Sequence, residues 1–153
     1  MSTMEPPSTF TDTLRQLRQD AAAATAAHAA ARGAERYRLL GVVMDLRKRE
    51  WAACDAQRAR LESGAALESV EETAACALEQ GIAATGAASA WLLLAQDGDD
   101  PADVAECRDR ARGWLAEADH RCVEALFLDF ALADSPALLA ARDAILSVQR
   151  ELE

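Results

Sequence analysis

Apolar and small residues recur every three or four positions along most of this chain, which is the spacing of one face of an α-helix. The clearest run alternates steps of four and three and consists of Phe10, Leu14, Leu17, Ala21, Ala24, His28 and Ala31. Alternating steps of this kind form the seam along which two helices pack. The pattern therefore predicts a first helix that begins near residue 9 or 11 and ends at a break around Gly33.

A second helix is predicted over residues 34–61, and its apolar face is wide. Placed at 100° per residue, its apolar positions cover about 200° of the helix surface. They are Leu39, Leu40, Val42, Val43, Met44, Leu46, Trp51, Cys54 and Leu61. A face of this width predicts contact with two neighbouring helices, or with one neighbour and an external partner.

Capping signals divide the rest of the chain. Ser69 begins a capping box with Glu72, which predicts a third helix that starts there and that could kink or split at Gly81 or Gly86. The acidic segment 97–101 supplies an Asp and a Pro for the start of a fourth helix, predicted to continue to about residue 133 unless Gly113 interrupts it. Ser135 and Pro136 repeat the signal and predict a last helix over residues 136–151.

The composition agrees with this helical pattern. The chain has 37 alanines among its 153 residues, against six valines and two isoleucines. Alanine is the best helix former, whereas the β-branched residues that favour strands are scarce. We therefore predict an all-α fold: an antiparallel bundle of four or five Ala-rich, closely packed helices. Residues 1–8 are expected to form a flexible tail, and residues 9–153 a single domain.

The formal net charge of −10 narrows the classes of partner. Nucleic acids and anionic membranes attract basic proteins, so we expect neither as a partner. No stretch is long and apolar enough for a transmembrane helix, and the N-terminal residues do not resemble a signal peptide. We expect a soluble, cytoplasmic protein.

Charge is segregated along the chain. Residues 32–60 hold eight basic and four acidic side chains, whereas residues 61–153 hold six basic and nineteen acidic ones. Arg36, Arg47 and Arg58 are eleven positions apart, which returns each to nearly the same angle on the second helix, inside its apolar face. Two interpretations are open. In the first, these arginines pair with acids on the other helices. In the second, they belong to an exposed partner-binding surface, whose candidate residues are Arg36, Leu40, Val43, Arg47, Trp51 and Arg58.

The sequence contains only weak signatures of catalysis or of ligand binding. No phosphate-binding loop, nucleophile elbow or dinucleotide fingerprint occurs, so we expect no enzyme, no cofactor and no metal site. The four cysteines, Cys54, Cys76, Cys107 and Cys122, form no CxxC pair and read as small buried apolar residues. His28 lies among alanines on the first seam and reads as a partly buried, hydrogen-bonded side chain.

These observations favour a non-catalytic protein–protein interaction module, such as an adaptor, a regulator or an export-type chaperone, that presents helical grooves to a partner. Its partner would be another protein or a second copy, with a homodimer expected. The alternative hypothesis is a small helical bundle that binds haem, a metal or another small ligand through His28, His120 or the cysteines. A weaker third hypothesis is redox sensing by a cysteine pair.

Overall fold

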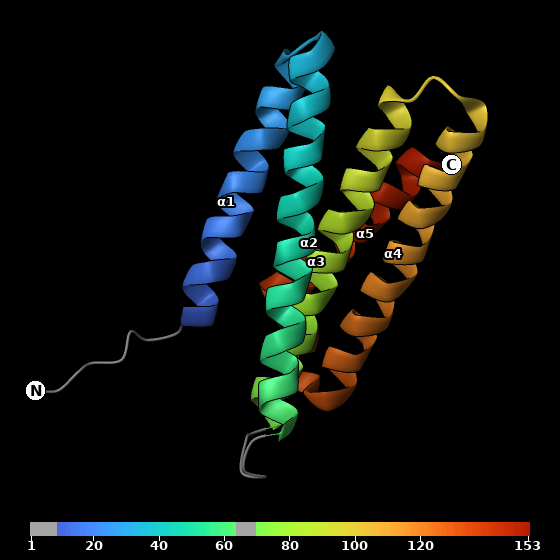
Figure 1. Cartoon of the computed structure of the whole chain (residues 1–153). Coiled ribbons are helices and arrows are strands. Elements are labelled where there is room, and N and C mark those ends of the chain that lie inside the picture. The colour runs from blue at the N-terminus through green and yellow to red at the C-terminus, as the bar shows by residue number, and fades with distance from the viewer. Residues whose placement is uncertain (1–8, 64–69) are drawn as a thin grey trace, which may run out of the picture.

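The computed structural model describes residues 9–63 and 70–153, and its regular structure is entirely helical (Figure 1). Five α-helices and one short 3-10 helix follow one another along the chain. They are α1 (Thr9–Ala30), α2 (Gly33–Ser63), α3 (Val70–Asp97), α4 (Pro101–Leu128), η1 (Phe130–Asp134) and α5 (Pro136–Leu152). The prediction of an all-α helical bundle is confirmed.

Several predicted helix ends are confirmed by their caps. Gly33 adopts a φ of +60°, a left-handed conformation that favours glycine, at the tight turn between α1 and α2. Asp100 caps α4, because its carboxylate accepts a hydrogen bond from the Ala102 amide. Ser135 caps α5 in the same way. The capping box predicted at Ser69 and the predicted tail over residues 1–8 lie outside the described residues.

The sequence left open whether three glycines interrupt their helices, and the structure shows that none of them does. Helix α3 continues through Gly81 and Gly86, and α4 continues through Gly113. The two glycines of α3 make room for neighbours rather than break the helix, since a β-carbon at Gly81 would lie 2.9 Å from Cys122 Sγ. The predicted end of α4 near residue 133 is wrong. The helix ends at Leu128, because Asp129 adopts an extended conformation and its side chain caps η1.

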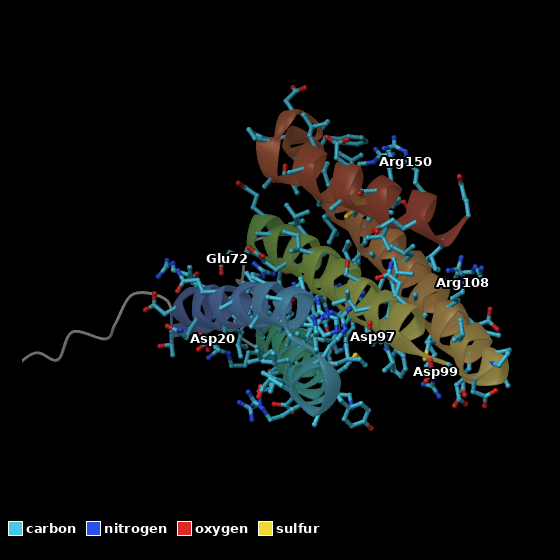
Figure 2. All side chains as sticks on the ribbon, turned by 90° about the horizontal axis from the view of Figure 1, so that it is seen from above. Asp20, Glu72, Asp97, Asp99, Arg108 and Arg150 are labelled. Atoms are coloured by element: carbon cyan, nitrogen blue, oxygen red, sulfur yellow. The ribbon has the colours of Figure 1, made fainter. Side chains whose placement is uncertain are left out.

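Helix α3 is the centre of the bundle. It packs against α2 on one side and against α4 and α5 on the other, while α1 packs against α2 at the outer edge (Figure 2). Alanine occupies many buried positions of α3, including Ala77, Ala83, Ala84 and Ala88, so its neighbours can approach closely. None of the described helices carries an apolar stretch of the length needed to cross a lipid bilayer.

Helices α2 and α4 flank α3 without packing directly against each other. In the part of the chain that the structure describes, no Cα atom of α2 lies within 8 Å of a Cα atom of α4. Side chains connect the two helices, through the ring pair of Trp51 and Trp114 and the ion pair of Arg58 and Glu124. A groove lined by residues of α2, α3 and α4 is the site described next.

Candidate functional site

The first predicted site residue, Arg36, takes part in an ion-pair network rather than in a free surface. Its guanidinium donates to both carboxylate oxygens of Asp97 on α3, at 2.8 and 3.0 Å, and to the His28 carbonyl on α1 at 2.9 Å. The His28 ring nitrogen Nε2 lies 2.7 Å from the same Asp97 carboxylate, and His28 is buried. The expected hydrogen-bonded role of His28 is confirmed, and the network ties α1, α2 and α3 together.

Arg58 makes an equivalent connection at the other end of α2. Its guanidinium donates to Glu124 on α4, with a shortest distance of 2.6 Å, and to the Gln80 side chain on α3 at 3.0 Å. The hydrogen bond from Arg58 lowers the pKa of Glu124. Arg58 therefore holds α2, α3 and α4 together where no backbone contact joins α2 and α4.

Arg47 belongs to a third network around a buried carboxylate. Glu50 is only 1% exposed, and its two oxygens accept from Arg47 at 2.9 Å and from Arg18 on α1 at 2.7 Å. Arg18 also reaches Glu79 on α3. Of the two interpretations of the arginines, the pairing with acidic side chains is the one that the structure shows.

The six candidate partner-binding residues do not form one exposed surface. Leu40 and Val43 are 3% and 1% exposed, because the wide apolar face of α2 is covered by α1 and α3. The expectation that they would offer a contact surface is wrong for this conformation. Trp51 is half-buried, and it and Arg47 line the groove between α2 and α4, whereas the other four residues do not.

All three tryptophans of the chain line this groove, which we call the tryptophan cleft. Trp51 comes from α2, Trp91 from α3 and Trp114 from α4, and each is half-buried. The rings of Trp51 and Trp114 meet edge to face, with centroids 5.2 Å apart and an interplanar angle of 75°. This pair joins α2 to α4 and closes one end of the cleft.

The tryptophan cleft is a sizeable hollow with apolar and charged walls. Its volume is about 710 Å³. Small and apolar residues form much of its lining: Met44, Ala87, Ala90, Leu94 and Val104. Charged residues contribute from both walls: Arg47, Lys48, Asp99, Asp103, Glu106 and Arg110. The guanidinium of Arg110 lies over the Trp91 ring, 5.1 Å from its centroid, which is a cation–π contact.

The histidines and cysteines do not assemble into a metal site in residues 9–63 and 70–153, where no three His, Cys, Asp or Glu side chains group around a common point. All four cysteines are buried and free. Burial raises the pKa of Cys54 to about 12 and that of Cys76 to about 11, so both thiols stay protonated at neutral pH. Only Cys107 lines the cleft. The geometry thus lends no support to ligand binding through these side chains.

Comparisons with known protein families, with curated proteins and with solved structures find no match to this chain. The sequence placed Trp51 on a wide apolar face, but it did not bring Trp51 together with Trp91 and Trp114. One signal of this cleft was available in the sequence. The apolar face of α2 is wider than contact with a single neighbouring helix requires, so part of it is left for another contact.

Proposed function

We propose that this protein is a non-catalytic interaction module whose tryptophan cleft binds a helix of a partner protein. The observation that carries the proposal is the convergence of all three tryptophans, from three different helices, on one half-open cleft. Tryptophan is enriched among the residues that dominate binding energy at protein interfaces. Half-buried rings offer apolar area that an incoming side chain would remove from water.

The shape of the cleft suits a helix. Its lining follows α3 from Ala87 to Gly98, which at 1.5 Å per residue is a length of about 16 Å, or three helical turns. Its walls are the two helices α2 and α4, which descend on either side of α3 in Figure 1. A helix that fills a groove uses apolar anchors at positions i, i+3 or i+4, and i+7, and three turns accommodate that set.

The biological role that fits such a module is that of an adaptor, a regulator or an export-type chaperone. Four free, buried thiols are typical of proteins in a reducing compartment, which supports a cytoplasmic location. A second copy of this chain is the other protein that could supply the helix. A dimer that a cleft-binding peptide dissociates would identify the second copy as the occupant.

Selection of peptide ligands tests the proposal. A displayed library of helical peptides is selected against the full chain, and each selected peptide is titrated while tryptophan fluorescence is recorded. Because every tryptophan lines the cleft, occupancy changes the emission directly. We expect Leu94→Glu to weaken binding about tenfold or more, since it puts a charge on the apolar lining.

The matched control is Leu139→Glu, which makes the same change at an exposed position of α5 outside the cleft. We expect it to leave peptide binding intact. Circular dichroism of both variants checks that helix content is kept. Selected peptides that bind both variants equally, or that leave the fluorescence unchanged, would show that the cleft is not the binding site.

One observation favours a second candidate, an apolar small molecule. The volume of about 710 Å³ lies within the range of small-molecule pockets. Native mass spectrometry of the purified protein separates the two candidates. A bound species of a few hundred daltons, absent from Leu94→Glu, would favour the small molecule over the helix.

A further inference from the structure

The two ends of the tryptophan cleft carry opposite charge. At one end the exposed Lys48 of α2 lines the cleft. Its neighbour Arg47 also lines this end, but the Arg47 guanidinium lies against Gly86 of α3 and is paired with the buried Glu50 carboxylate, so the unpaired positive charge here is that of Lys48. At the other end the cleft is lined by Asp99 and Asp103, beside Gly98. Twelve residues of α3 separate these levels, which corresponds to about 18 Å. The cleft therefore has a basic end and an acidic end.

The charges between these ends cancel. Glu106 and Arg110 both line the middle of the cleft, and their side chains lie 3.4 Å apart as an ion pair one helical turn apart on α4. Arg110 also covers the face of Trp91. The middle of the cleft is thus apolar and neutral overall, and the difference in charge is confined to its ends.

Three of the end charges remain open to an occupant, although Asp103, in the first turn of α4, also stabilises the positive end of that helix. Lys48, Asp99 and Asp103 are exposed, and none of them forms an ion pair with another residue that the structure describes. Capping does not account for Asp99, because Asp100 already caps α4. Figure 2 shows Asp99 at the end of α3, on the side of the bundle opposite α5. An occupant of the cleft would meet both kinds of charge in full.

We infer that the tryptophan cleft binds its partner helix in one direction, with a basic N-terminal turn at the Asp99–Asp103 end and an acidic C-terminal turn at the Lys48 end. This inference rests on the proposed function. The charges of the end residues select oppositely charged side chains. The helix dipole acts in the same sense, because the positive N-terminus of a helix is stabilised by acids and its negative C-terminus by bases.

Three synthetic peptides test the direction. All share a helix of about 14 residues with leucines at i, i+4 and i+7. The first has a lysine-rich N-terminal turn and a glutamate-rich C-terminal turn, the second has these turns exchanged, and the third has glutamine at all charged positions. We expect the first to bind the full-length protein roughly threefold to tenfold more tightly than the third at low salt. The advantage should shrink as salt is added.

Photo-cross-linking determines directly in which direction the bound peptide lies in the cleft. A benzophenone at the N-terminal turn of the first peptide should label residues 94–104, and one at its C-terminal turn should label residues 44–51. In the double variant Lys48→Glu, Asp103→Lys the preference should move to the second peptide. The control Arg49→Glu, Asp109→Lys makes the same charge changes at exposed positions that do not line the cleft, and should keep the original preference.

The outcomes separate the two proposals. Equal affinities for all three peptides, with each benzophenone labelling both segments, would overturn the directional inference and leave the cleft as a helix-binding site. Failure of every peptide, including the selected ones, to bind or to change tryptophan fluorescence would overturn the proposed function as well.

Discussion

The guanidinium of Arg47 lies directly against Gly86, so that the central helix carries no side chain at the point where Arg47 crosses it. A β-carbon at Gly86 would lie 3.0 Å from both Cζ and Nη1 of Arg47. The same Arg47 donates to Glu50, whose carboxylate is buried. Glycine at position 86 therefore supports an ion pair on a neighbouring helix, at a cost in helix propensity.

Gly86→Ala is expected to destabilise the protein by about 1 kcal/mol. Alanine gains about 1 kcal/mol of helix propensity, but it displaces Arg47 and weakens a charged hydrogen bond to a buried group, which is worth about 1.5–3 kcal/mol. Chemical denaturation measures the difference. Gly113→Ala is the control, because no neighbouring atom lies within 4 Å of its β-carbon position, and it should stabilise the protein by up to about 1 kcal/mol. Stabilisation by both substitutions would refute the role assigned to Gly86.

Glu50→Gln is expected to reduce the free energy of unfolding by about 2–3 kcal/mol. Loss of one partner of a fully buried ion pair costs about 3–5 kcal/mol, and the value here is smaller because Arg18 and Arg47 are partly exposed and can turn towards water. Urea denaturation provides the measurement. Glu35→Gln removes an exposed partner of Arg38 and should change stability by less than about 0.5 kcal/mol. Equal effects of the two substitutions would contradict a structural role for the buried carboxylate.

Acid should weaken the bundle through Asp97 and Glu124. Hydrogen bonds from Arg36 and from Arg58, respectively, lower the pKa values of these carboxylates in the folded state. A lowered pKa stabilises the fold above the ordinary value of about 4, and this stabilisation is lost as the pH falls through the lower folded value. We therefore expect the free energy of unfolding to decline between about pH 5 and pH 3.

Denaturation at a series of pH values checks this decline. The double variant Asp97→Asn, Glu124→Gln should be less stable at pH 7 and should show a shallower dependence on pH across the same interval. If the variant and the original protein lost stability in parallel, these two ion pairs would not be the source of the acid sensitivity.

The four cysteines should be inert in the folded protein. Burial raises the pKa of each thiol, to about 12 for Cys54 and about 11 for Cys76, so little thiolate is present at pH 8. A thiol reagent should react slowly with the native chain and promptly with all four groups in denaturant. Cys107, which lines the cleft, should react first, and a cleft-binding peptide should slow it. Prompt labelling of Cys54 in native buffer would contradict this assignment and would revive a redox role.

The local sequence pattern was sufficient to predict the helical elements of this fold. Alanine content, the seam positions of α1, and the caps at Asp100 and Ser135 all act within one helix or one turn, and sequence order alone specifies them. The glycines were harder to interpret. A helical glycine can mark a break or a close approach, and only the neighbour, Arg47 at Gly86 or Cys122 at Gly81, decides between the two.

The sequence by itself determined an all-α bundle. It also determined the position of an apolar face on α2 that is wider than packing against one neighbouring helix requires. It could not determine which part of that face would be covered. Packing of α1 and α3 buried Leu40 and Val43, and it left Trp51 beside a groove. Only the tertiary structure brought Trp91 and Trp114 to the same groove, because their convergence depends on the relative rotation and separation of three helices. Those quantities are set by contacts between residues far apart in the chain, which no local periodicity records.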